Sequence, residues 1–285
     1  VLCGLLLLAP WVAAADPAVT GVLASDSLIA DGDVPGPLTV AIDFDVAMNT
    51  SIPPTLIFAP DVSSTLSLVP GGSWTDSDTY TATYSVADGN VDVDSVMIDV
   101  TGAWDLAGKP QQDYTPVHEF EIDTLNPLAP AVTGIATDAG SSNADAVTND
   151  STLILSGTAE SQSSVRLYRD GSSIGVAPAN GTGTWTFDYQ GTVLPDGTYR
   201  FKATATDLAG NVSPESTPLT VLVDTQPAPA PQRLTPSDGT RTNDNTPTFS
   251  WTAPTDPGDS GVRDYGYDIG GPTPKNSTTG PPRRP

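Results

Sequence analysis

Residues 184–207 read TWTFDYQGTVLPDGTYRFKATATD, and they carry the clearest strand pattern in the chain. Trp185 and Phe187 alternate with polar residues, and the run 199–205 alternates in the same way. A period of two is typical of a β-strand with one buried face. Asp196-Gly197 is a hairpin-type turn signal between the two runs. We therefore expect two strands separated by a turn, with Trp185 and Phe187 as anchors of the core.

The same pattern occurs throughout the chain. Apolar and polar residues alternate from Leu38 to Phe44 and from Tyr80 to Val86, and Asp88-Gly89-Asn90 and Asp170-Gly171 are further turn signals. The 26 glycines and 28 prolines are also consistent with many turns. About seven short strands per hundred residues, joined by regular turns, predict an all-β fold of two-sheet sandwiches.

Internal repeats divide the chain into modules. Asp-Leu-Ala-Gly occurs at 105–108 and again at 207–210, and each copy is followed by an Asp-Thr pair, at 123–124 and at 224–225. Pro-Ala-Val-Thr-Gly starts at Pro17 and again at Pro130. A period near 100 residues indicates tandem domains. We place module one at 16–126 and module two at 127–226. An incomplete third module with a disordered tail occupies 227–285, and proline-rich linkers separate the modules.

The N-terminus has a different character. An apolar run at Leu5–Leu8 precedes three alanines at 13–15, which is the pattern of a secretory signal peptide over residues 1–15. Removal of this segment would remove Cys3, the single cysteine, so we expect no disulfides. The sequence after this segment has no run of 18 apolar residues, so it predicts no membrane span in this stretch. The sequence therefore predicts a secreted, extracellular or cell-surface protein.

The charge balance excludes one class of partner. The chain has 34 acidic and 11 basic residues, for a net charge of −23. Nucleic-acid binding needs a basic face, so we expect no nucleic-acid partner. The acidity fits a solvated surface, and it also fits carboxylates that hold Ca²⁺; the two readings are compatible.

Two strings resemble serine-hydrolase signatures without their context. Residues 171–175 satisfy G-x-S-x-G but are expected in a hairpin, and residues 258–261 read Gly-Asp-Ser-Gly. The chain has one histidine, His118, in module one, where it alternates in phase with Phe120 as a strand residue at the edge of the core. Neither serine has a base in its own module, so we expect no catalysis. One histidine and no mature cysteine also exclude a conventional zinc site.

Module two carries a specific resemblance. Its segments are NDSTLILSGTAE at 149–160, GTWTF at 183–187, LPDGTY at 194–199 and ATATDLAGNVS at 203–213. Module two resembles the bacterial immunoglobulin-like (Ig-like) repeats of large surface adhesins. Module one is similar but more divergent, with Lys109 where module two has Asn211. The third module resembles the opening half of a fibronectin-type or Ig-like domain. The resemblance thus implies tandem Ig-like β-sandwiches, two complete and a third partial.

Calcium is implied by the same resemblance, because several such repeats bind Ca²⁺ where successive modules join. Carried over to this sequence, the candidate ligands are Asp207, Asp224 and Asp244 for the second junction and Asp105, Asp123 and Asp150 for the first. Carboxylates with loop carbonyls suit the six to eight oxygen ligands of Ca²⁺. In the alternative interpretation, Asp105 and Asp207 form turns and bond nearby backbone N–H groups.

Two functions remain open from the sequence. The first is an extracellular structural or adhesive stalk, a monomeric rod that attaches to an unidentified host, matrix or cell-surface ligand. The second is a set of non-catalytic spacers or carbohydrate-contacting modules within a larger secreted enzyme. The adhesive role rests on the family resemblance, because a fold alone does not determine a function.

Overall fold

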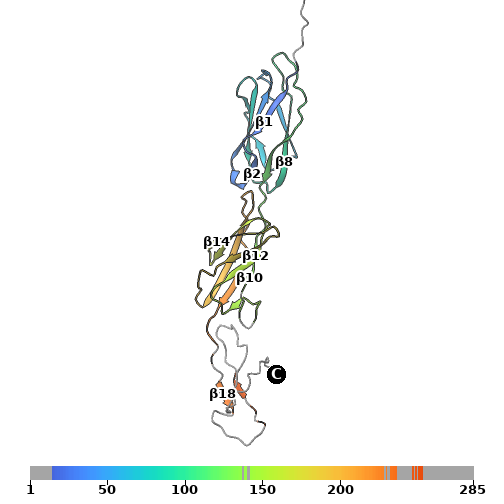
Figure 1. Cartoon of the computed structure of the whole chain (residues 1–285). Helices are drawn as coiled ribbons and strands as arrows, with labels where there is room; N and C mark the ends of the chain where they lie inside the picture. Colours follow the sequence, from blue (N-terminus) through green and yellow to red (C-terminus); the bar gives the residue numbers. More distant parts are fainter. Residues whose placement is uncertain are drawn as a thin grey trace, which may run out of the picture. The chain divides into compact units, whose positions relative to one another are not determined.

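The computed structural model describes residues 15–136, 138–139, 142–227, 229, 232–235, 246, 248 and 250–252. The predicted signal peptide, apart from Ala15, and most of the predicted third module lie outside these residues. The chain divides into two compact units (Figure 1). Unit 1 comprises Val1–Asn126 together with Ala209–Asn211, and unit 2 comprises Pro127–Leu208 and Val212–Pro285.

Unit 1 contains two β-sheets and one short 3-10 helix, η1 (Asp31–Asp33). The first sheet has the order β1-β3-β7-β5, with β6 also paired to β7, and the second has the order β2-β9-β8-β4. The strands are β1 (Val19–Ala24), β2 (Leu28–Ala30), β3 (Pro37–Phe44), β4 (Thr55–Ala59), β5 (Leu66–Leu68), β6 (Ser73–Trp74), β7 (Thr79–Val86), β8 (Asp92–Thr101) and β9 (His118–Asp123).

The core of unit 1 follows the predicted alternation. In β3, Leu38, Val40 and Ile42 are buried while Asp43 is exposed, and these apolar residues belong to one hydrophobic cluster with Phe120 of β9. Complete burial of a side chain of this size contributes about 1.5–3 kcal/mol. The alternation predicted for Leu38–Phe44 is therefore confirmed, because each second side chain enters the space between the sheets.

Unit 2 also has two sheets, in the orders β10-β12-β15 and β11-β17-β16-β13-β14. Its strands are β10 (Ala131–Ile135), β11 (Val147–Thr148), β12 (Ile154–Thr158), β13 (Ser164–Arg169), β14 (Ser172–Pro178), β15 (Thr184–Asp188), β16 (Gly197–Thr206) and β17 (Leu219–Val223). Two further short strands, β18 (Gln232–Thr235) and β19 (Ser250–Thr252), pair with each other. The predicted all-β fold class is confirmed.

Trp185 is the large aromatic residue at the centre of unit 2. Its side chain is 2% exposed, whereas Phe187, two residues along β15, is only partly buried. Gly157 of β12 pairs with Trp185, and a Cβ atom at this glycine would lie 2.3 Å from the indole carbon Cζ2 and 1.9 Å from the carbonyl oxygen of Ala131. A glycine is therefore required where the indole ring crosses β12, because any side chain would occupy the same volume as the ring.

Both units close with the same strand pairing. In unit 1, β2 runs parallel to the last strand, β9, with Ala30 opposite Asp123. In unit 2, β11 runs parallel to the last strand, β17, with Thr148 opposite Val223. All other strand pairs in the two units are antiparallel in the described residues. Extending the β11–β17 register by one residue places Asn149 opposite Asp224, as Ala30 lies opposite Asp123.

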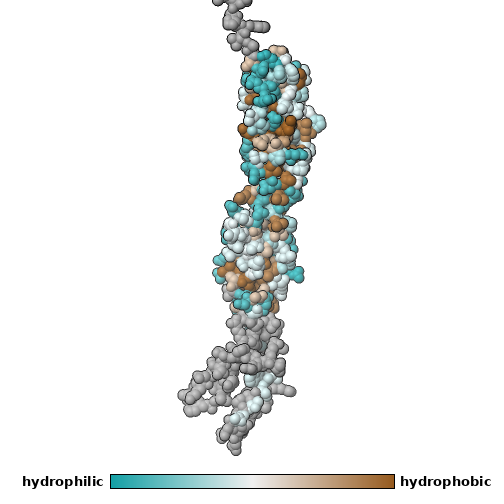
Figure 2. All heavy atoms as spheres, turned by 90° about the vertical axis from the view of Figure 1, so that its right-hand side faces the viewer, coloured by the Kyte–Doolittle hydropathy of each residue, from teal (hydrophilic) through white to brown (hydrophobic). Residues whose placement is uncertain are grey.

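The surface is mixed in character. Figure 2 shows apolar residues in small patches separated by hydrophilic ones on the visible face of the described units. Leu106 and Leu208, which occupy equivalent positions in the two Asp-Leu-Ala-Gly repeats, are among the most exposed apolar residues. Isolated apolar side chains of this kind are common on soluble domains.

Candidate functional site

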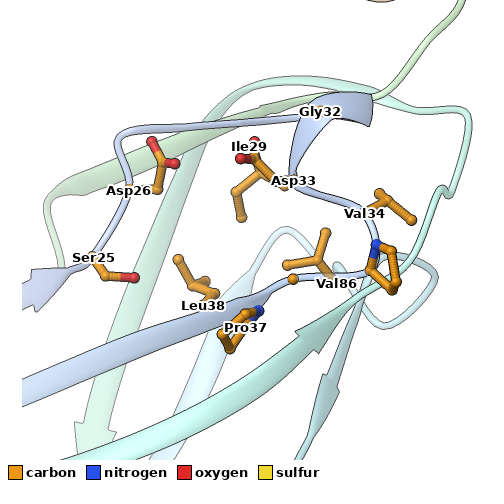
Figure 3. Close-up of a pocket in the computed structure, with 11 residues that line it drawn as sticks. Ser25, Asp26, Ile29, Gly32, Asp33, Val34, Pro37, Leu38 and Val86 are labelled. Carbon is orange, nitrogen blue, oxygen red and sulfur yellow. The ribbon is translucent and has the colours of Figure 1, made fainter.

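One hollow lies in unit 1, where the segment from Ser25 to Leu38 turns over the end of the sandwich. It has a volume of about 470 Å³. Figure 3 shows Asp26 and Asp33 along one side and the aliphatic side chains of Leu38 and Val86 along the other. Asp26 Oδ1 accepts a hydrogen bond from the N–H of Leu28 (3.2 Å), and Asp33 Oδ2 accepts one from the N–H of Ala30 (2.9 Å). Both carboxylates therefore hold the shape of the loop that borders the hollow.

A second candidate site is built around Asn211, the last residue of the segment Ala209–Asn211. This segment belongs to unit 1, although the flanking residues Leu208 and Val212 belong to unit 2. The Asn211 side chain is fully buried at 0% exposure. Its Nδ2 donates to the carbonyl oxygen of Asp123 (2.9 Å) and to Asp123 Oδ1 (3.1 Å). Its Oδ1 accepts a hydrogen bond from the N–H of Asp31 (3.0 Å). We call this arrangement the asparagine clasp.

Asp123 is placed for the clasp by the end of β9. Its Oδ1 also accepts the N–H of Leu125 (3.1 Å), which turns the chain immediately after the strand. The adjacent Thr124 is fully buried and is bonded to Val91 through its backbone N–H (2.8 Å). Because a carboxamide both donates and accepts, Asn211 satisfies an acidic acceptor and a backbone donor at once.

The equivalent position in unit 2 is Asp224. Its Oδ1 accepts the N–H of Gln226 (3.1 Å), just as Asp123 accepts that of Leu125. Its N–H donates to the carbonyl oxygen of Thr148 (2.9 Å). The residue is 6% exposed, and its Oδ2 is buried without a hydrogen-bond partner among the described residues. Such an oxygen is uncommon in folded proteins, where buried polar atoms are nearly always bonded.

Asp196 bonds the two residues that follow Asp224, and both of its carboxylate oxygens accept hydrogen bonds. Its Oδ1 accepts from the N–H (2.9 Å) and the hydroxyl (2.8 Å) of Thr225, and its Oδ2 accepts from Gln226 Nε2 (3.1 Å). The backbone hydrogen bond from Thr225, aided by the Thr225 hydroxyl and the Gln226 amide, lowers the pKa of the Asp196 carboxyl. Asp196 thus holds the two residues that follow Asp224 in a fixed turn.

Besides Asp123 and Asp224, two more of the six predicted calcium ligands accept hydrogen bonds within local turns. Asp105 Oδ1 accepts the N–H of Lys109 (2.7 Å), and Asp150 Oδ1 accepts both the N–H (2.8 Å) and the hydroxyl (2.7 Å) of Thr152. Asp207 directly follows β16, and Asp244 lies outside the described residues. Across the part of the chain that the structure describes, no three His, Cys, Asp or Glu side chains are grouped so that they could hold a metal ion. Calcium binding by these residues stays a prediction.

The serine motif at Gly171–Gly175 lies where the sequence predicted. It spans the turn of the antiparallel hairpin β13–β14, with Ser172 and Ser173 exposed. The second motif, at 258–261, lies outside the described residues. His118 is at the start of β9, exposed, with its Nδ1 3.0 Å from Ser95 Oγ. The hairpin differs from the strand-to-helix turn on which a nucleophilic serine of this motif sits.

The sequence did not identify Asn211 as a functional residue. The signal available was the one difference between the two Asp-Leu-Ala-Gly repeats, Lys109 in place of Asn211. In unit 1, Lys109 Nζ lies 3.4 Å from Asp16 Oδ1. The same turn position therefore carries a cation in one repeat and a buried carboxamide in the other.

Comparison with protein families gives one match, to the second unit. Residues 127–225 match the family model described as bacterial Ig-like domain. No curated protein matches the chain. The described residues contain no helix with the length and apolar character needed to cross a bilayer.

Solved structures with similar architecture include proteins of several kinds. The ligand-binding domain of human OSCAR is 12% identical, with a TM-score of 0.30, covering 73% of this chain and 98% of that one. A biofilm-associated protein, its BSP domain, is 18% identical with a TM-score of 0.25, covering 73% of this chain and 30% of that one. A family 28 exopolygalacturonase from Yersinia enterocolitica is 16% identical with a TM-score of 0.24, covering 36% and 21%. The chain thus spans less than a third of the length of the latter two.

Proposed function

We propose that this chain, whose residues 127–225 form a bacterial Ig-like domain, is a non-catalytic extracellular stalk that bears load in surface or matrix attachment. The observation that carries the proposal is the parallel pairing that closes each unit, β2 with β9 and β11 with β17. A domain placed in series between an anchored and a bound end must resist extension along its chain. The parallel pair is the element that would do so.

The geometry of the pair gives the physical reason. When the ends of a unit are pulled apart, its early strand is drawn toward the N-terminus and its last strand toward the C-terminus. Parallel strands then slide along each other, and the hydrogen bonds between them share the load and break together. In an antiparallel hairpin pulled from its open end, the bonds would break one after another. Shear of this kind therefore needs the larger force.

The bonds that would share the load are defined in each unit. In unit 1 the N–H of Glu121 donates to the carbonyl oxygen of Ser27 (2.9 Å). In unit 2 the N–H of Leu222 donates to the carbonyl of Ala146 (2.9 Å), and the N–H of Asp224 donates to that of Thr148 (2.9 Å). These contacts lie at the same end of the fold in both units, beside the exit Asp-Thr pair.

Force spectroscopy on the 285-residue chain tests the proposal. We expect separate unfolding steps for the two units, and the release of residues 131–223 at about 3.5 Å each should lengthen the chain by roughly 300 Å. Leu222→Pro removes the N–H that donates to the carbonyl oxygen of Ala146, so the rupture force of the unit 2 step should fall while that of unit 1 is unchanged.

Leu167→Ala is the matched control for this experiment. Leu167 is fully buried in β13, outside the β11–β17 pair, and its truncation should cost about 2–5 kcal/mol of unfolding free energy. We expect this variant to unfold at lower denaturant but to keep most of its rupture force. Equal loss of force in both variants would show that the parallel pair does not carry the load, and would contradict the proposed function.

Calcium binding at the predicted carboxylates is tested by thermal unfolding with Ca²⁺ and with a chelator. A ligand that binds only the folded state adds about 2.7 kcal/mol at a hundredfold excess over its dissociation constant. Asp224 has a buried oxygen without a partner in the described chain, whereas Asp123 Oδ1 already accepts two donors. Any increase in the unfolding midpoint caused by Ca²⁺ should therefore be reduced more in Asp224→Ala than in Asp123→Ala. If the thermal unfolding midpoint is the same with Ca²⁺ and with the chelator, the prediction of calcium binding is wrong.

A further inference from the structure

The exit of unit 2 contains an acceptor that the described chain leaves unused. Asp224 is 94% buried, being 6% exposed, and its Oδ2 has no hydrogen-bond partner among the described residues. The residues around it, Asn149, Thr225 and Gln226, are exposed. The carboxylate therefore lies beside an exposed edge of unit 2, although Oδ2 itself is buried.

Unit 1 shows what the equivalent position binds. Asp123 is the last residue of β9, and Asp224 directly follows β17. Each lies beside the early parallel strand of its unit and uses Oδ1 to accept the N–H two residues ahead at 3.1 Å. In unit 1 the carboxamide of Asn211 donates to the carbonyl and carboxylate oxygens of Asp123. The same backbone geometry in unit 2 presents the same two kinds of acceptor.

One difference between the sites affects the other half of the carboxamide. In unit 1, the N–H of Asp31 donates to Asn211 Oδ1. The equivalent N–H in unit 2 is that of Asp150, which already donates to Thr148 Oγ1 (3.0 Å). Recognition in unit 2 therefore depends mainly on the donor, the amide nitrogen, and on Asp224 as its acceptor.

We propose that the Asp224 end of unit 2 is a docking site for the Gly-Asn turn of another Ig-like repeat, whose asparagine amide donates to Asp224. This inference rests on the proposed function, in which Ig-like modules act in series. The Asp at the exit of the last strand accepts, and an Asn that follows the Ala-Gly of a turn donates. A repeat with lysine at this position, as at Lys109, would lack the carboxamide.

A cyclic peptide with the sequence of residues 206–212, TDLAGNV, is the probe. Thr206 and Val212 form an antiparallel bridge in the structure, so closing the peptide at these residues reproduces the turn. We would titrate it, with a chelator present, into the ¹⁵N-labelled 285-residue chain and follow the amide signals of Asp150, Thr225 and Gln226. A few hydrogen bonds should give a dissociation constant in roughly the millimolar range.

Matched variants make the result decisive. The signal shifts should be lost with a peptide carrying alanine for asparagine, and weakened at least about tenfold in Asp224→Ser. They should persist in Asp188→Ser, which alters an exposed aspartate that likewise accepts an N–H two residues ahead. The Asn211→Ala chain is the positive control, because its vacated Asp123 should respond to the same peptide.

Three results would overturn the docking site. The first is the absence of amide signal shifts around Asp224 at millimolar peptide. If signals around Asp123 do shift in the Asn211→Ala chain, the peptide is competent and the failure lies in unit 2. The second is an equal response to the alanine peptide. The third is displacement of the peptide by Ca²⁺ alone, which would assign the oxygen to a cation. Rupture forces do not enter this experiment, so its failure would leave the stalk proposal to its own test.

Discussion

Trp185→Ala is expected to lower the free energy of unfolding of unit 2 by about 3–5 kcal/mol, because it removes a buried aromatic side chain and leaves a cavity between the sheets. Collapse around the cavity is limited by Gly157, which has no side chain to fill the vacated volume. Urea denaturation followed by circular dichroism would measure the loss. A domain of about 100 residues often has a total stability of 5–15 kcal/mol, so the variant should be close to unfolding.

Trp104→Ala is the control for this variant. Trp104 lies in unit 1 and is substantially exposed, so its truncation removes less buried area and does not touch unit 2. Its effect on the unit 2 transition should be within about 0.5 kcal/mol. A loss below about 1 kcal/mol in Trp185→Ala would show that the indole is not the anchor of this core.

Asn211→Ala is expected to lower the unfolding free energy of unit 1 by about 2–3 kcal/mol. The fully buried carboxamide bonds a carboxylate, a carbonyl and a backbone N–H, and hydrogen bonds to charged groups contribute about 1.5–3 kcal/mol. The measurement is the chemical denaturation of unit 1, followed by the amide signals of β9. Asn180→Ala is the control, because Asn180 makes several turn hydrogen bonds but is exposed, where water can replace them.

A charge variant at the same position adds a pH dependence. Asn211→Asp places a second carboxylate against Asp123, so at neutral pH it should destabilise unit 1 more than the alanine variant. Because the two like charges raise the pKa at which the pair takes up a proton, protonation should restore a donor as the pH falls toward the ordinary carboxyl range near about 4, and the difference from the native protein should narrow. A pH-independent difference, or an Asn211→Ala effect no larger than that of Asn180→Ala, would show that the clasp is not energetically important.

The strands were predictable because their information is local. Alternation at Leu38–Phe44 and at 199–205 requires only that one face of a strand be buried, and β3 and β16 cover both stretches. The hairpin at Asp170-Gly171 was equally readable, since both residues adopt positive φ there, 50° and 84°. Trp185 as the core anchor was also correct, while Phe187 is only partly buried because it lies nearer the end of β15.

The site was not predictable to the same extent, because its partners are distant in the chain. Asn211 bonds Asp123 across 88 positions and Asp31 across 180, and no local pattern encodes either contact. In the sequence Asn211 is simply the last residue of a turn. Asp105 and Asp150, by contrast, find their partners within four residues, as the turn-former interpretation of Asp105 anticipated.

An all-β chain with a repeat near 100 residues could be predicted from the amino-acid sequence, because side-chain periodicity and turn chemistry act over a few neighbours. The roles of the individual acidic residues became visible only in the folded chain. It buries Asp224 with an unused oxygen and pairs Asp123 with a carboxamide, whereas Asp105 closes a local turn. The physical reason is that the role of a carboxylate depends on its burial and on the donors within about 3 Å, and both are set by strands far apart in the chain.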